Sequence, residues 1–125
     1  MNSPTYIIRN QTNINFTTVD NYFIKDKNLS TCAKGLLIQL LALPDKWEFS
    51  KSGMLTQIKE GKKFLHHYLQ ELKENGYVAI DKFRDPESGK YLYQYHIYAV
   101  PYFCEFLPDG NIFNPKTNKV GREDV

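Results

Sequence analysis

Five polar side chains that suit nucleic-acid recognition stand close together near the middle of the chain. They are Lys62, Lys63, His66, His67 and Gln70. A lysine donates to phosphate oxygens or to guanine acceptors, and a glutamine can form two hydrogen bonds with adenine. A histidine side chain is short enough to lie near the floor of a groove, where it donates or stacks. The alternative is an ordinary solvated surface with two incidental histidines.

Metal and catalytic chemistry fit these residues less well. Adjacent residues of a helix point about 100° apart, so His66 and His67 do not converge on one zinc ion. The chain contains no Gly-rich phosphate loop, no HExxH, no GxSxG and no carboxylate pair placed by a motif. The sequence therefore predicts a protein that is not an enzyme and that needs no metal, cofactor or small-molecule substrate.

The spacing of apolar residues predicts a helix that holds the five polar side chains on one face. The residues with the i, i+3, i+4, i+7 spacing of a helix face are Leu65, Tyr68, Leu69 and Leu72. The opposite face is basic at its N-terminal end and becomes acidic only at Glu71 and Glu74. Asn75 and Gly76 supply the left-handed residue that ends a helix. We expect a helix from Lys62 to Asn75 that presents its first two turns to a polyanion.

A longer apolar helix is predicted earlier in the chain. Ser30 or Thr31 is a suitable N-cap, and residues 32–43 are apolar on nearly all sides, which is typical of a helix at the centre of a domain. Cys32 is then most simply a buried thiol. Gly35 costs about 1 kcal/mol in a helix relative to Ala, and a close crossing with another helix would explain it.

A second helix is predicted from Lys51 to about Lys59, with Ser50 as its N-cap. Backbone N–H groups and the dipole at a helix N-terminus favour phosphate, so Lys51 and Ser52 are further candidates for DNA contact. Plain capping is the alternative. A tight turn at Gly61 leads into the helix that starts at Lys62. Two short helices joined in this way form a helix-turn-helix arrangement.

The periodicity changes from 3.6 to 2 after this helix and predicts strands at residues 77–84 and 91–100. Arg84 and Lys90 flank the turn between them and are candidates for contact with phosphates or with the minor groove. Acidic residues at the tip weaken that interpretation. The tyrosines of the second strand could stack on bases, although hairpin packing or a dimer interface explains their alternation as well. Helices followed by a hairpin form a winged helix.

The run from Asp26 to Val78 resembles the helix-turn-helix domain of phage and plasmid replication initiators and DnaD-type replisome organisers. The blocks that carry the resemblance are KNLSTCAKGLL at 27–37, LPDKWEFS at 43–50 and LQELKENGYV at 69–78. Tyr68 departs from the pattern, since such helices usually carry a small residue there. The resemblance implies an α+β winged-helix fold and sequence-specific binding of double-stranded DNA, often at an origin or operator and usually by an oligomer.

We expect one winged-helix domain over residues 1–100, in which 1–17 form an extended or hairpin segment. Residues 101–125 are predicted to be a tail whose last ten or so residues are disordered, because they are almost free of apolar side chains. The formal charge of +2 says little about partners. The N-terminus lacks the apolar core of a signal peptide and no run is apolar enough to span a membrane, so a cytoplasmic protein is expected.

The interpretation that follows is a DNA-binding protein in replication initiation or replisome organisation of a phage, plasmid or mobile element. Double-stranded DNA is the expected partner, with a homodimer as the expected assembly and other replication proteins as further partners. Three alternatives stay open. They are a transcriptional regulator of the same fold, a winged-helix module that binds protein instead of DNA, and a binder of RNA or single strands that uses the tyrosine-rich hairpin.

Overall fold

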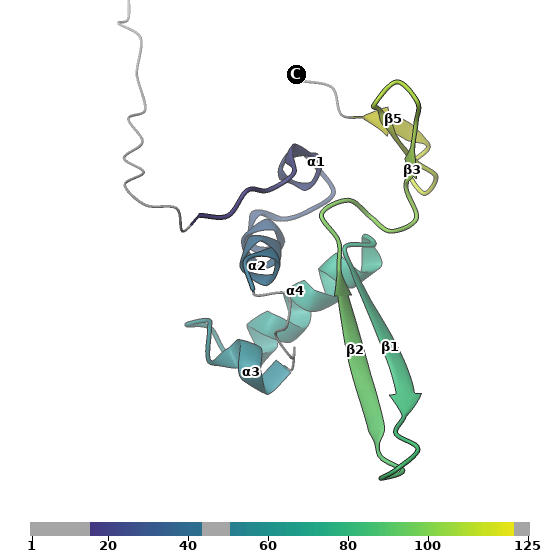
Figure 1. The fold of residues 1–125 in the computed structure, drawn as a ribbon. Coiled ribbons are helices and arrows are strands. Elements are labelled where there is room, and N and C mark those ends of the chain that lie inside the picture. The colour runs from purple at the N-terminus through teal and green to yellow at the C-terminus, as the bar shows by residue number, and fades with distance from the viewer. Residues whose placement is uncertain (1–15, 44–50, 122–125) are drawn as a thin grey trace, which may run out of the picture.

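The computed structural model describes residues 16–43 and 51–121. Within these ranges the chain has four helices and two small antiparallel sheets, so the predicted α+β class is confirmed. The helices pack together, a long hairpin reaches away from them, and a second sheet lies at the other end of the molecule, near the first helix (Figure 1). The predictions for residues 1–15, for the extended stretch at 47–49 and for a cap at Ser50 lie outside the described residues.

Two helices form the first half of the fold. Helix α1 (Asn21–Ile24) is a single turn capped by Asp20, whose side chain accepts from Tyr22 N. Helix α2 (Thr31–Leu41) is capped by Ser30, whose Oγ accepts from Ala33 N at 3.1 Å, as predicted. The residues that α2 buries are Ala33, Leu36, Leu37 and Leu40.

Two predictions about α2 are wrong for the same reason. Cys32 is exposed, and a Cβ atom built on Gly35 would meet nothing within 4 Å, so Gly35 does not mark a close helix crossing. Both residues lie on the row of α2 that contains Gln39 and Ala42, opposite the buried row. An apolar composition suggested a helix buried all round, yet only one side of it is enclosed.

Helix α3 (Lys51–Leu55) is shorter than the predicted 51–59, and it buries Met54 completely. Helix α4 (Lys62–Glu74) matches the predicted helix, and its buried residues are Leu65, Leu69 and Leu72. Tyr68 is half-buried. Its ring lies 4.6 Å from that of Phe64, and a hydrogen bond with the Cys32 thiol raises the pKa of its hydroxyl. The helix ends at Asn75, and Gly76 has the expected positive φ of 86°.

Strands β1 (Val78–Arg84) and β2 (Tyr91–Ile97) form the predicted hairpin, with Val78 opposite Ile97 and Arg84 opposite Tyr91. Its base packs on the helices through Val78, Ile80, Tyr95 and Ile97. Tyr77, at the junction with α4, is fully buried and donates from its hydroxyl to Asp26 Oδ2 at 2.7 Å. Desolvation and the neighbouring Asp26 carboxylate raise the pKa of Tyr77 far above its usual value.

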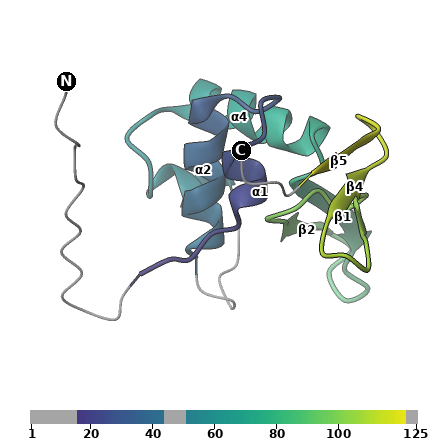
Figure 2. The same cartoon turned by 90° about the horizontal axis from the view of Figure 1, so that it is seen from above.

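The predicted tail is instead a three-stranded antiparallel sheet, in the order β3–β4–β5. Its strands are β3 (Glu105–Phe106), β4 (Ile112–Asn114) and β5 (Lys119–Gly121). Ile112 is fully buried, and the buried Asn114 accepts from Lys116 N and donates to Tyr22 Oη at 3.3 Å. Seen from above, this sheet lies over the base of the hairpin and beside α1 (Figure 2). The prediction of disorder is therefore wrong for residues 116–121.

Candidate nucleic-acid interface

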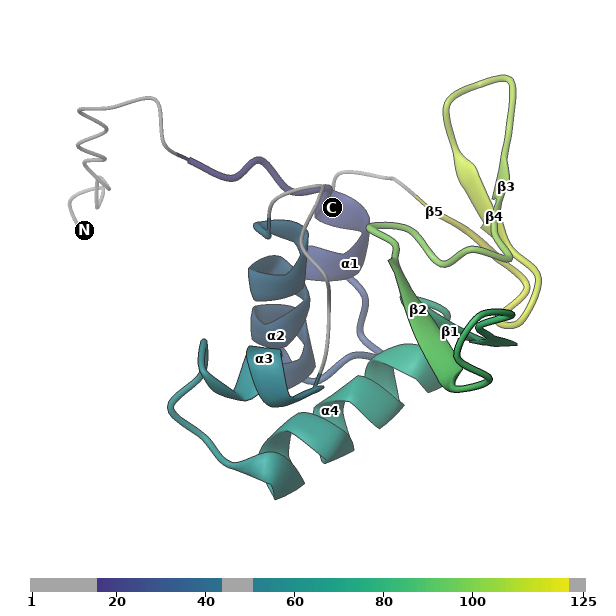
Figure 3. The same ribbon diagram turned by 60° about the horizontal axis from the view of Figure 1, so that its bottom comes forward.

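The outward side of α4 carries the five residues singled out by the sequence. Because Leu65, Leu69 and Leu72 bury the opposite row, the structure leaves these five exposed together. They are Lys62, Lys63, His66, His67 and Gln70. The first turn of α4 contains no acidic residue. Figure 3 shows α4 along its length, with nothing of the described chain drawn over its first turns.

The acidic residues in the second half of α4 are engaged within the protein. Glu71 accepts from Ser30 N at 2.7 Å and from Ser30 Oγ at 3.0 Å, so a carboxylate of α4 caps the N-terminus of α2. Glu74 Oε1 accepts from Gln70 Nε2 at 3.3 Å. Gln70 must release this contact before both polar atoms of its amide can reach a base.

The two histidines lie on the exposed side of α4. The ring of His67 lies edge-on to that of Tyr68, with centroids 4.7 Å apart. No group of three or more His, Cys, Asp or Glu side chains suited to a metal ion occurs among residues 16–43 and 51–121. On this exposed surface the histidines can donate hydrogen bonds or stack.

The N-terminus of α3 supports the predicted phosphate contact less than the sequence suggested. Ser52 is exposed and lies in the first turn of α3, directly after Lys51. A helix of only five residues aligns few peptide dipoles, so its field at the N-terminus is weak. A phosphate contact by Lys51 and Ser52 stays a prediction.

Arg84 and Lys90 are exposed on either side of the turn of the hairpin, which follows α4 in the sequence. Arg84 Nε donates to Gly89 O at 3.2 Å, which leaves its terminal nitrogens available at the tip. Asp85 accepts from Glu87 N at 3.0 Å and from Ser88 Oγ at 2.9 Å. These hydrogen bonds, that of the Glu87 backbone first, hold the pKa of Asp85 below its usual value.

Sequence reasoning did not find the pairing of cations with tyrosines along the hairpin. Lys82 lies opposite Tyr93 and Arg84 opposite Tyr91, and Lys82 Nζ sits 4.2 Å from the centre of the Tyr91 ring. The signal that could have revealed this pairing is the strand register, which depends on where the turn begins and ends.

Comparison with known proteins adds nothing to this geometry. No family model, no curated protein and no solved structure matches the chain. The resemblance described above therefore rests on the residues quoted for it. Among the described residues, no helix is long and apolar enough to cross a bilayer.

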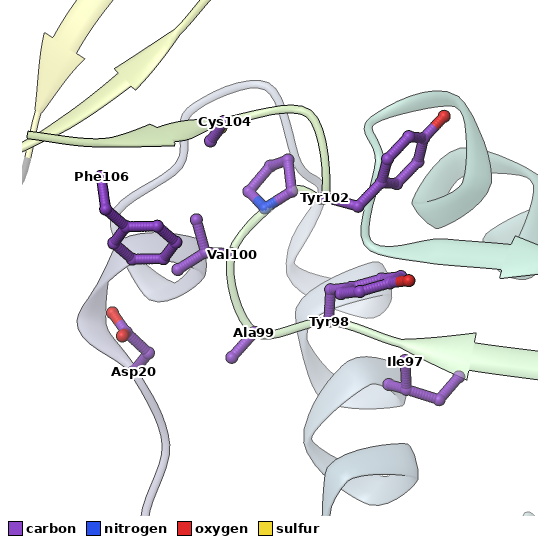
Figure 4. Close-up of a pocket in the computed structure, with 9 residues that line it drawn as sticks. Asp20, Ile97, Tyr98, Ala99, Val100, Tyr102, Cys104 and Phe106 are labelled. Atoms are coloured by element: carbon purple, nitrogen blue, oxygen red, sulfur yellow. The ribbon is translucent and has the colours of Figure 1, made fainter.

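An apolar groove of about 470 Å³ lies at the opposite end of the hairpin. It is lined by Asp20 and by side chains from residues 97–106, among them Tyr98, Tyr102 and Phe106 (Figure 4). Its carboxylate, Asp20, already accepts from Tyr22 N at 2.8 Å. Burial raises the pKa of its thiol, Cys104, which disfavours the reactive thiolate.

Proposed function

We propose that this chain is a winged-helix protein that binds double-stranded DNA by placing α4 in the major groove, with the β1–β2 hairpin as its wing. The role that fits the sequence resemblance is replication initiation or replisome organisation of a phage, plasmid or mobile element, in the cytoplasm. Transcriptional regulation by the same fold is the second candidate, since both roles require the same contacts.

The observation that carries the proposal is the division of α4 into two sides. One side is held by three buried leucines, and the other exposes two lysines, two histidines and an amide with no carboxylate in the first turn. An α-helix fits the major groove, where lysine and glutamine side chains can distinguish bases. Phosphate contacts by lysines and Arg84 supply affinity, and base contacts by Lys63, His66, His67 and Gln70 supply specificity.

The arrangement of elements supports the same proposal. A winged helix requires three helices followed by a hairpin, and the order α2, α3, α4, β1 and β2 supports that proposal. The turn of the hairpin lies toward the bottom of Figure 1, the same side on which α3 and the first part of α4 lie, whereas α1 and the β3–β5 sheet lie at the top. A duplex bound along the lower side would meet α4 and the hairpin together.

A homodimer belongs to the proposal, because one monomer buries too little surface to select a single site in a genome. Sedimentation of the chain with and without its DNA would measure the assembly. Other replication proteins are the further partners that the proposed role requires.

Titration with duplex DNA at two salt concentrations tests the proposal. If about four to six phosphates are neutralised, log K falls with log salt at a slope of about −4 to −5. The triple variant Lys62→Ala, Lys63→Ala and His67→Ala should lose duplex binding and keep its melting temperature, since all three side chains are exposed. Absence of binding to any duplex at about 50 mM salt would refute the proposal, because electrostatics alone supply non-specific affinity under that condition.

Selection of bound sequences from a random pool separates the two candidate roles. Recovery of repeated sites, as at an origin, supports replication initiation, whereas recovery of a single palindrome supports an operator and a transcriptional role.

A further inference from the structure

The outer half of the β1–β2 hairpin exposes an unusual set of side chains. Phe83, Tyr91, Leu92 and Tyr93 are between 43% and 58% exposed. A solvent-exposed hairpin ordinarily carries polar residues at such positions, and a cluster of large apolar side chains on a surface marks a binding site. The base of the same hairpin needs no such explanation, because its side chains pack on α2 and α4.

The strand register separates the outer half of the hairpin into two faces of opposite charge. Residues directly opposite each other point to the same side of a sheet. We name as the inner row the residues that continue the side packed on the helices, and they are Lys82, Arg84, Tyr91 and Tyr93. The other face carries Asp81, Phe83, Leu92 and Gln94. Both cations in the strands of the outer half are thus in the inner row with both exposed tyrosines, whereas Asp81 is on the other face and Lys90 lies in the turn.

In the inner row the two cations of β1 face the two tyrosines of β2. Lys82 Nζ lies 4.2 Å from the centre of the Tyr91 ring, a cation–π contact that also orients the lysine. Arg84 is oriented by its bond to Gly89 O. Asp81, on the opposite face, is paired with His96 Nε2 at 2.8 Å. The side chains of the inner row thus include two cations and no carboxylate.

We propose that the inner row binds unpaired bases of a DNA single strand next to the duplex held by α4, so that the target is a junction of duplex and single strand. This proposal rests on the proposed function. Stacking of bases on aromatic side chains beside a cationic groove is how single strands are held. In an intact duplex both faces of each base pair are already stacked, so a tyrosine ring finds no base face there.

The spacing of the two rings suits this ligand. Residues two apart on a strand are separated by about 6.6–6.8 Å, which is close to twice the base-stacking distance of about 3.4 Å. One base fits between Tyr91 and Tyr93 once Lys82 Nζ moves off the Tyr91 ring, and Lys82 and Arg84 then meet the phosphates on either side. A second copy of the chain fits this surface less well, because a twofold interface would bring the same cations of both copies together.

The test measures the affinity of the full chain by fluorescence anisotropy for three DNA probes. The probes are a blunt duplex of about 20 base pairs, the same duplex with a single-stranded tail of about eight thymidines, and the tail alone. The wild type should bind the tailed duplex about tenfold or more tightly than the blunt one, since each stacked base contributes measurably. Tailing either the 3′ or the 5′ end shows which strand polarity the row accepts.

Three double variants assign the effect to the rings. Tyr91→Ala with Tyr93→Ala should abolish the preference for the tail and leave blunt-duplex affinity unchanged. Tyr91→Phe with Tyr93→Phe should keep the preference, because the rings remain. Phe83→Ala with Leu92→Ala removes a similar exposed apolar area from the opposite face and should also keep it. Melting temperatures, expected to be unchanged for exposed side chains, confirm that each variant is folded.

The outcomes separate this inference from the proposed function. Equal affinity of the wild type for blunt and tailed duplex overturns the inference and leaves duplex binding intact. Loss of the preference in the Phe83/Leu92 variant, or a change from oligomer to monomer in the Tyr91/Tyr93 variant to Ala, also overturns it, the latter in favour of a second copy. Tyrosine-dependent binding of the single strand without any duplex binding would refute both the proposed function and the junction as its target. It would support only the stacking of bases on Tyr91 and Tyr93.

Discussion

The first two turns of α4 and the inner row of the hairpin offer the same charge with different neighbours. In α4, Lys62 and Lys63 stand beside two histidines, and no exposed Phe, Tyr or Trp of α4 accompanies them. In the hairpin, Lys82 and Arg84 on β1 lie opposite Tyr93 and Tyr91 on β2. Short polar side chains suit the edges of stacked base pairs, and rings suit the faces of unstacked bases, so the two surfaces are matched to different states of DNA.

The two regions also differ in how they are supported. Buried leucines from Leu65 to Leu72 hold one side of α4 in the core, so the backbone that carries its outward side chains is fixed in place. The hairpin is packed on the helices only near its base, and beyond Ile80 and Tyr95 it is held by its own cross-strand bonds. A rigid helix can read a regular groove, whereas a hairpin with one supported end can follow a less regular single strand.

Gly76 is the joint between these regions, and its substitution has the largest expected effect. With φ at 86° a residue other than glycine is strained, and a Cβ there would lie 2.5 Å from Phe103 Cε2. We expect Gly76→Ala to lower the free energy of unfolding by about 2–4 kcal/mol, measured by urea denaturation. The clash would also move the hairpin relative to α4, so junction binding should weaken more than blunt-duplex binding.

Gly110→Ala is the matched control. Gly110 has nearly the same φ, 87°, and nothing lies within 4 Å of its Cβ position. It should cost only the backbone strain, about 1–2 kcal/mol. If Gly110→Ala were as destabilising as Gly76→Ala, the close approach of Phe103 would have no energetic consequence.

Salt dependence separates the contributions of the two regions to DNA affinity. Replacing Lys62 and Lys63 with Ala should weaken duplex binding by about ten- to a hundredfold and reduce the slope of log K against log salt by about one to two, with about one for each of the two lysines that meets a phosphate. Replacing Tyr91 and Tyr93 with Ala should leave that slope unchanged. Lys116→Ala with Lys119→Ala, at the β3–β5 end, removes the same charge and should affect neither quantity. An equal slope change in this control would mean that only net charge matters.

The parts of the fold that could be predicted from sequence are those with a repeated local pattern. Helix α4 and the hairpin were found because four apolar residues follow the helical period and the next stretch alternates. The end at Gly76 was found because a positive φ needs glycine. The five exposed polar residues of α4 follow from the same periodicity, since fixing one face of a helix fixes the other.

The β3–β5 sheet could not be predicted, because its strands of two or three residues are too short to show a period. It is held by contacts across the chain, such as Asn114 to Tyr22, which a local pattern does not contain. Cys32 was misjudged because composition alone does not say how much of a helix is enclosed. The inner row could not be predicted because it depends on the register of the two strands, and the register depends on the exact position of the turn.

Tyr77→Phe tests how firmly the base of the hairpin is held to the helical part. The change removes a partly buried hydrogen bond to Asp26 and should cost about 1–2 kcal/mol, measured by urea denaturation. Because the folded protein raises the pKa of Tyr77, this residue contributes stability that is complete below the ordinary tyrosine value of about 10. That contribution is lost at higher pH, as the unfolded chain ionises and the folded Tyr77 does not. Stability of the wild type should therefore fall above about pH 10 more steeply than that of Tyr77→Phe. Tyr102→Phe, at an exposed position, should change neither quantity.

The smallest expected effect concerns Asp85. Its carboxylate makes the hairpin less suited to phosphate than α4. Its carboxylate sits at the turn, beside Arg84, whereas the first turn of α4 has no acid. Since hydrogen bonds from Glu87 N and Ser88 Oγ lower its pKa, Asp85 supports the turn above the ordinary aspartate range and loses this role as the pH falls through its lowered pKa. The amide resonance of Glu87, followed by NMR, should titrate with a midpoint below the usual value of about 3.9. Ser88→Ala removes one donor and should move that midpoint upward without unfolding the protein. A midpoint at the ordinary value in the wild type would mean that the carboxylate is not tied into the turn.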